Sequence, residues 1–166
     1  MACVAGGTRQ KLSMISTVTN QGKTSWMIID DNFNHLHLIE FSQALIRQAR
    51  RKVFLVLDNL GVHHCAPVTK WLSEHGEQIE VFYLPGYSPE LSPDQRLNDD
   101  LKQAIETRVP CRTKDKPWLA ATNRMAAIEK NSARIKAFFK DPVVAYAAKQ
   151  YFLAESIRIS TLLIAV

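Results

Sequence analysis

The alternation of apolar and polar residues along the chain predicts short strands joined by amphipathic helices. Two β-branched stretches flank a turn signal at 20–23, and a wholly apolar run at 53–57 predicts a strand covered on both faces. The predicted strands are 11–19, 24–29, 53–57 and 79–84. Helical spacing of apolar residues predicts helices over 37–50, 66–75, 92–105, 116–130 and 133–140. This order of elements predicts an α/β fold with a mixed sheet.

Length and composition favour one domain. The chain has 166 residues, of which 46% are hydrophobic, enough for a single core. Cys3, Cys65 and Cys111 lie too far apart for a disulfide framework or a Cys-x-x-Cys metal site. The start of the chain lacks a signal-peptide pattern, and the apolar run 161–166 is shorter than the roughly 20 residues that span a bilayer. We therefore expect a cytoplasmic protein that makes no membrane contact.

Charge is distributed unevenly along the sequence. Residues 51–110 carry six basic and nine acidic side chains, whereas residues 111–166 carry ten basic and four acidic ones. An acidic middle and a basic end suit a metal-dependent enzyme that acts on a polyanion, because carboxylates hold cations while lysine and arginine contact phosphates. A solvated basic helix accounts for the same distribution equally well.

The first candidate for chemistry is Asp58, which ends the apolar strand abruptly. A carboxylate at the carboxyl end of a buried strand lies where open α/β sheets build their sites. A bound metal ion would explain the charge, although a turn-capping role together with Asn59 is the simpler alternative. The neighbouring histidines, His63 and His64, would point to different sides of an extended loop, so no dedicated zinc site is expected.

The second candidate lies at the start of the helix predicted from Ser92. Two-metal cleavage of a phosphodiester needs a further carboxylate from another element, and Asp94 and Gln95 occupy the first turn of this helix. However, Ser92 as N-cap, Pro93 as first residue and Gln95 three residues after the cap also form a capping box. Asp94 is likewise favoured by the helix dipole. A metal is therefore not needed to explain this segment.

Several motifs become informative together because of their order and spacing. They are Leu55-Val56-Leu57-Asp58-Asn59 with His63, Phe82-Tyr83-Leu84-Pro85, Tyr87-Ser88-Pro89-Glu90-Leu91, Ser92-Pro93-Asp94-Gln95 before Leu101-Lys102, and Phe138-Phe139-Lys140-Asp141-Pro142. In this order they resemble the DDE transposases of bacterial insertion sequences related to the mariner superfamily. The resemblance covers roughly Thr8–Ala148 and leaves Lys149–Val166 as a tail outside the family.

The resemblance implies an RNase H-like mixed sheet flanked by helices. In this family three carboxylates hold two divalent metal ions, Mg²⁺ or Mn²⁺, for DNA cleavage and strand transfer at transposon ends. Asp58 falls on the second carboxylate and is the expected metal ligand, while Gln95 falls on the third, where its neutral amide is a poor ligand for a hard cation. Asn59, His63 and Asp94 are expected to support the site. The family's first carboxylate lies on a strand upstream of the predicted hairpin, and Met1–Gly7 is too short to supply it.

These departures predict a truncated transposase core with a helical C-terminal extension, defective in catalysis and weak in metal binding. Without the first strand two strand edges would be unpaired, so we expect the strands to close up, a partner chain such as a second copy to fill the gap, or marginal stability. The alternative function is a non-enzymatic DNA-binding or interaction remnant; a third is a nuclease using Asp58 and Asp94 with Asp99 or Glu90. The expected DNA contacts are Lys102, Arg108, Arg112, Lys114 and Lys116.

Overall fold

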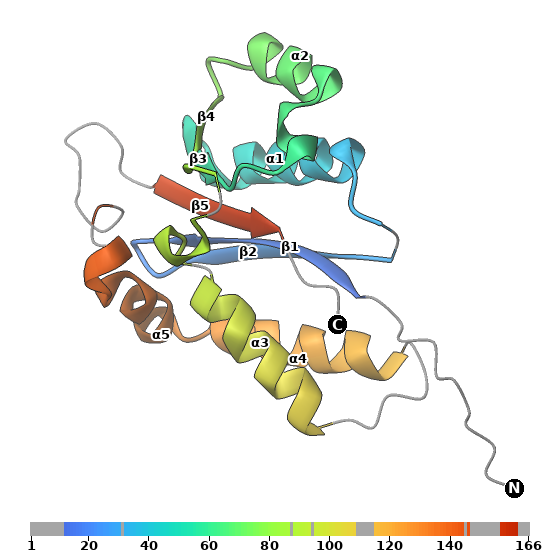
Figure 1. The fold of residues 1–166 in the computed structure, drawn as a ribbon, viewed down its shortest axis with the longest axis vertical. Helices are drawn as coiled ribbons and strands as arrows, with labels where there is room; N and C mark the ends of the chain where they lie inside the picture. Colours follow the sequence, from blue (N-terminus) through green and yellow to red (C-terminus); the bar gives the residue numbers. More distant parts are fainter. Residues whose placement is uncertain are drawn as a thin grey trace, which may run out of the picture.

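A computed structural model describes residues 12–30, 32–86, 88–93, 95–108, 115–144, 146 and 157–162. Its strands form one mixed sheet in the order β2-β1-β5-β3-β4 (Figure 1). The strands are β1 (Ser13–Thr19), β2 (Thr24–Ile29), β3 (Val53–Leu57), β4 (Ile79–Tyr83) and β5 (Ile157–Leu162). The four strands expected from the sequence are therefore present, with boundaries that differ by no more than two residues. β5 was not expected.

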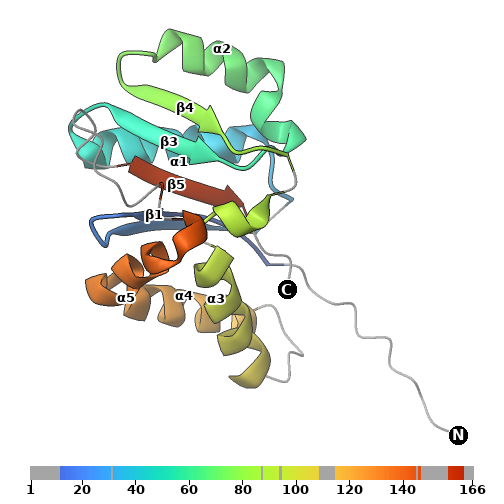
Figure 2. The same cartoon turned by 60° about the vertical axis from the view of Figure 1, so that its left-hand side comes forward.

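Helices cover both faces of the sheet. Figures 1 and 2 show α1 (His35–Ala49) and α2 (Ala66–Glu74) on one face, and α3 (Gln95–Arg108), α4 (Asp115–Glu129) and α5 (Ser132–Ala137) on the other. Short 3₁₀ helices lie at Gly61–His64, Pro89–Leu91, Phe138–Lys140 and Pro142–Val144. Within the described ranges, no helix combines the length and the apolar character needed to cross a membrane.

Each face of the sheet has its own hydrophobic core because successive residues of a strand point to opposite sides. On β1, Met14 packs into the core beneath α3, α4 and α5, whereas the next residue, Ile15, packs into the core beneath α1 and α2. Both residues have only 1% of their surface exposed. The apolar run of β3 is explained in the same way, since Leu55 faces the α1 core and Val56 contacts the α3 core.

The helix starts differ from the expected pattern. α1 begins with a capping box in which the Asn34 side chain accepts from the backbone of Leu36 and His37, and His37 accepts from the Asn34 backbone. The helix expected from Ser92 starts later in the structure. α3 begins only at Gln95, whose backbone N–H donates to the Ser92 carbonyl at 3.1 Å. The Gln95 side-chain amide nitrogen donates to Asp99 one turn further on.

The central strand, β5, comes from the C-terminal tail 149–166, where the sequence predicted a helical extension outside the family and no strand. β5 runs antiparallel to β1 and parallel to β3, and these two strands are joined through it (Figure 1). The physical reason is that the facing edges of β1 and β3 carry backbone N–H and C=O groups that need partners. The gap is thus filled by the tail of the same chain, which differs from the three expected outcomes of closed-up strands, a partner chain or marginal stability.

Candidate functional site

Asp58 lies at the carboxyl end of β3, beside the ends of two parallel neighbours. β3 pairs in parallel with both β4 and β5, so the three strands end at the same edge of the sheet. The Asp58 side chain is 28% exposed, and its Oδ1 is buried. Its position is the one expected for a site in an open α/β sheet.

The strongest support for Asp58 comes from His63, in the 3₁₀ turn Gly61–His64. His63 Nδ1 lies 2.7 Å from the Asp58 main-chain oxygen and 3.1 Å from its Oδ1. A carbonyl oxygen only accepts, so Nδ1 carries the proton and donates it to the backbone of Asp58. Burial lowers the pKa of His63, and the hydrogen bond to Asp58 opposes this only in part. His63 is therefore a neutral donor that fixes the loop beside the carboxylate.

Three further side chains hold this loop together. The Tyr83 hydroxyl at the end of β4 donates to the His63 carbonyl at 3.0 Å, and burial raises the pKa of Tyr83, which keeps the hydroxyl protonated. The His64 ring lies against the Tyr83 ring with centroids 4.2 Å apart, and its Nε2 contacts Asn59 Oδ1. Asn59 thus helps to hold the His64 ring, which lies against Tyr83. Tyr83 and His64 were not expected in this role, because no local pattern connects β4 to the turn after β3.

Gln95, which the sequence predicted at the third carboxylate position, is the first residue of α3. Its Nε2 donates to Asp99 Oδ1 at 3.1 Å, the i to i+4 contact that a helix allows. The amide nitrogen is therefore held by a neighbouring acid of the same helix. Asp94 lies outside the described residues.

The residues that the structure describes at this edge do not fit a two-metal centre. Hard cations such as Mg²⁺ take several oxygen ligands, with carboxylates providing the charge. Over the described ranges, no group of three or more His, Cys, Asp or Glu side chains is arranged to hold a metal ion. Asp58 contributes one carboxylate and Gln95 a neutral amide, so the expected ligand set is incomplete.

The expected DNA contacts are only partly placed. Lys102 is half-buried on α3, and Arg108 is the last residue of that helix. Lys116 belongs to the first turn of α4, while Arg112 and Lys114 lie outside the described residues. Exposed basic side chains that the sequence analysis did not single out follow α4 and α5. They are Lys130, Arg134, Lys136 and Lys140.

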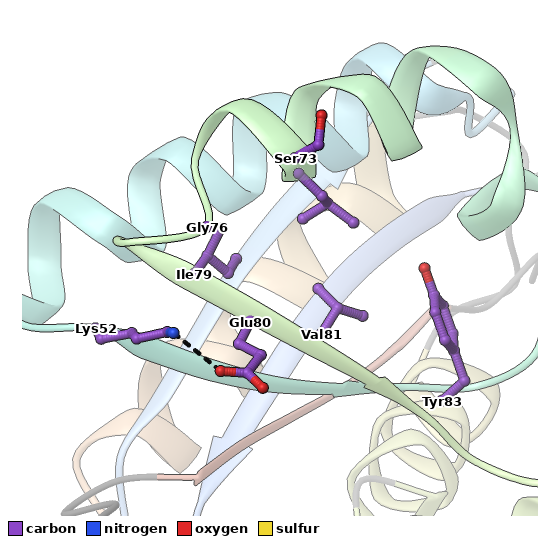
Figure 3. Close-up of a pocket in the computed structure, with 8 residues that line it drawn as sticks. Lys52, Ser73, Gly76, Ile79, Glu80, Val81 and Tyr83 are labelled. Carbon is purple, nitrogen blue, oxygen red and sulfur yellow. Dashed lines mark ion pairs between the residues drawn. The ribbon is translucent and has the colours of Figure 1, made fainter.

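A shallow hollow of about 370 Å³ lies beside β4, below α2 (Figure 3). Its acidic residue, Glu80, pairs with Lys52 at 2.9 Å, and apolar side chains such as Ile79 and Val81 form its floor. Tyr83 stands at one end of the hollow. The Glu80 carboxylate is paired with Lys52, and Asp58 does not line this hollow. The hollow is therefore distinct from the candidate site at Asp58.

The mixed sheet, the helices on both faces and the strand-ending carboxylate define the class of protein. The fold is similar to that in the crystal structure of the catalytic domain of Mos1 mariner transposase, with a TM-score of 0.56 and 19% identity over 79% of this chain and 72% of that one. This likeness shows an RNase H-like fold. Residues 3–116 match the family described as DDE superfamily endonuclease, and the chain belongs to this family. No curated protein matches the sequence.

Proposed function

We propose that this chain is a transposase catalytic core that has lost DNA cleavage and strand transfer. The observation that carries the proposal is the ligand set: Asp58 is held by His63, but the helix position that should supply another carboxylate carries Gln95, bonded to Asp99. In an intact site, two divalent ions supply the nucleophile and neutralise the charge on the reacting phosphate. Members of the superfamily generally depend on such ions.

The residues around Asp58 still hold its loop in place. His63 and Tyr83 fix the loop that presents Asp58. One anionic oxygen ligand and a neutral amide hold Mg²⁺ or Mn²⁺ only weakly, since both ions prefer several charged or carbonyl oxygens. Catalysis by positioned metal ions should therefore fall by orders of magnitude.

The test is nicking of supercoiled plasmid DNA in Mg²⁺ and in Mn²⁺. We expect no nicking above background from the purified chain, and the same result for Asp58→Asn. Glu77→Gln, a change at an exposed residue near the opposite end of β3 from Asp58, serves as the control for contaminating nuclease. Nicking by the unchanged chain that disappears specifically in Asp58→Asn would overturn the proposal.

The second candidate function is DNA binding without cleavage, and the excess of basic residues over 111–166 favours it. Fluorescence anisotropy with duplex DNA should give an affinity that falls steeply with salt, because binding releases counterions. Replacing Arg112, Lys114 and Lys116 by alanine should reduce the logarithmic salt slope by about 1 per lost phosphate contact. Failure to bind at low salt would end this candidate.

Three exposed lysines provide the matched comparison for those positions: one directly after α4, one in α5 and one in the 3₁₀ helix Phe138–Lys140. Lys130, Lys136 and Lys140 can be replaced together, which removes the same number of charges. A salt slope that falls only in this second variant would keep DNA binding and reject the first set of contacts. Equal changes in both variants would indicate general charge attraction without a defined contact surface.

A further inference from the structure

Strand β4 forms one edge of the described sheet. Within the described ranges it pairs with β3 alone. The Gln78 carbonyl accepts from the backbone of β3 and the Leu84 N–H donates to it, each at 2.8 Å. Because the backbone groups of successive residues point to alternate sides of a strand, Ile79, Val81 and Tyr83 direct their N–H and C=O groups away from β3. These outward groups form a template for a further strand.

The side chains of β4 do not protect this edge from pairing. Edge strands are commonly protected by lysine, proline or a bulge, but β4 pairs with β3 without interruption and contains neither residue. Its one charged side chain, Glu80, is already paired with Lys52 at 2.9 Å. Two aromatic residues at its end are exposed, Phe82 by 49% and Tyr83 by 38%. The edge is therefore largely apolar and carries little net charge.

The hollow beside β4 runs along the same edge. Ile79 and Val81 form its floor, and Leu72, Ser73 and Gly76 border it on the side of α2 (Figure 3). The nearest atom to an added Cβ at Gly76 would be 4.0 Å away, so this border leaves room for a side chain from outside. Because side chains alternate between the two faces of a strand, a strand placed along β4 would direct every second side chain over the hollow.

We propose that this edge pairs with β4 of a second copy of the chain, in an antiparallel arrangement centred on Val81. Val81 then faces Val81 of the second copy, and Ile79 faces Tyr83 in both directions. Every residue whose backbone groups point outward meets another such residue, and each pair exchanges two hydrogen bonds. The two sheets become one continuous sheet across the interface.

Neighbouring registers satisfy fewer backbone groups. Moving the centre one residue toward the start of β4 places Tyr83 opposite Glu77, which lies outside the strand. Moving it one residue toward the end places Ile79 opposite Pro85, which has no N–H to donate. The outward pattern of β4 is thus complementary to itself, as a two-fold interface requires. This self-complementarity is the reason for choosing a second copy as the partner.

The opposite face of β4 fits the same register. Glu80 faces Phe82 of the second copy, so like charges are not directly opposed. Phe82 stacks on Phe54 with ring centroids 6.5 Å apart, and Lys52 Nζ lies 5.7 Å from the Phe54 centroid. Pairing would therefore bring the exposed ring of each Phe82 beside an aromatic and cationic surface, where it gains apolar and cation–π contacts.

The interface is small, since it consists of five residues of strand and a shallow hollow. Interfaces that bury less than about 1,200 Å² are typical of weak complexes. We therefore expect a dimer that forms at micromolar concentrations or above and dissociates on dilution. The pairing does not depend on whether the chain cuts DNA, so the nicking test and the tests of the dimer can fail separately.

Sedimentation velocity at increasing concentration, up to about 1 mM, tests the dimer. The unchanged chain should shift from monomer toward dimer. Val81→Pro removes an outward N–H without removing a bond to β3 and should remain monomeric. Val81→Thr keeps the β-branched shape and the N–H, so this matched control should dimerise like the unchanged chain. A chain that stays monomeric, or a dimer that persists in Val81→Pro, would overturn the proposal, even if β4 bound an unrelated extended peptide.

Cross-linking tests the register and does not require the proline variant to fold. In a chain whose native cysteines are replaced by serine, Val81→Cys should give a covalent dimer on oxidation. Hydrogen-bonded partners in an antiparallel pair have Cα atoms about 5.5 Å apart, which is within reach of a disulfide. Phe82→Cys is the control, because its partner in this register is Glu80, and it should give no covalent dimer on a non-reducing gel. Equal cross-linking of the two variants would reject the proposed pairing.

Discussion

His63 is a buried side chain whose contribution to stability depends on pH. Its pKa is lowered by burial, so the folded chain resists a proton that the unfolded chain accepts near pH 6.5. The stabilising contribution is complete above pH 6.5, falls as the pH drops below that value, and levels off below the folded pKa. Thermal melts at pH 7.5 and pH 5.5 should show a larger loss for the unchanged chain than for His63→Gln. Identical losses would contradict this assignment.

Gly22 is the residue that allows the β1–β2 turn to approach α5. Its φ is +83°, and an added Cβ would lie 2.7 Å from the Ser132 carbonyl oxygen. Gly22→Ala combines a strained backbone with a clash and should cost about 2 kcal/mol or more in urea unfolding. Gly76→Ala is the matched control, because the nearest atom to its added Cβ is 4.0 Å away. A similar loss in both variants would show that the contact with α5 is unimportant.

Residue-level reasoning from the sequence reached the features that depend on neighbours in the chain. Asp58 was identified because an apolar run ends there, and the structure places it at the end of β3. The Gln95–Asp99 contact was overlooked although its i to i+4 spacing on a predicted helix was visible in the sequence. The Tyr83–His63 bond could not have been found, because it depends on how two separate segments meet in space.

Helices α3, α4 and α5 are joined by one carboxylate, which gives a prediction at the scale of elements. Asp100 on α3 accepts from Arg124 on α4 and from Arg134 on α5, where Nε lies 3.0 Å away. The Asp100 side chain is only 10% exposed, so Asp100→Asn would leave two guanidinium groups without their anion. We expect a loss of about 1–3 kcal/mol in urea unfolding. Asp99→Asn, at an exposed position of the same helix, should cost less; an equal cost would argue against the three-helix link.

Elements with strong local patterns could be predicted from the sequence, whereas β5 could not. β3 and β4 are short apolar runs next to turn signals, so their existence did not depend on the rest of the chain. β5 contains Arg158 and two hydroxyl residues, and its partners on β1 are more than a hundred residues away in sequence. A segment of this kind becomes a strand because two open edges need a partner, which is information that only the assembled sheet contains.

The dependence of the whole molecule on β5 leads to a last prediction. In the described sheet, β1 and β2 form one half and β3 and β4 the other, and β5 joins them. Ile159 is paired with Val18 on one side and Val56 on the other, so Ile159→Pro removes a ladder hydrogen bond at the centre. Hydrogen exchange should become faster in both β1 and β3, although the change lies in neither strand.

The control for this variant is a proline that the fold can accept. His35 is the first residue of α1, and Asn34 before it has the extended backbone that precedes proline readily. His35→Pro should therefore leave exchange in β1 and β3 unchanged. If Ile159→Pro also left both strands protected, the two halves of the sheet would have to be held together by their helices, and β5 would be an accessory to the fold and not its centre.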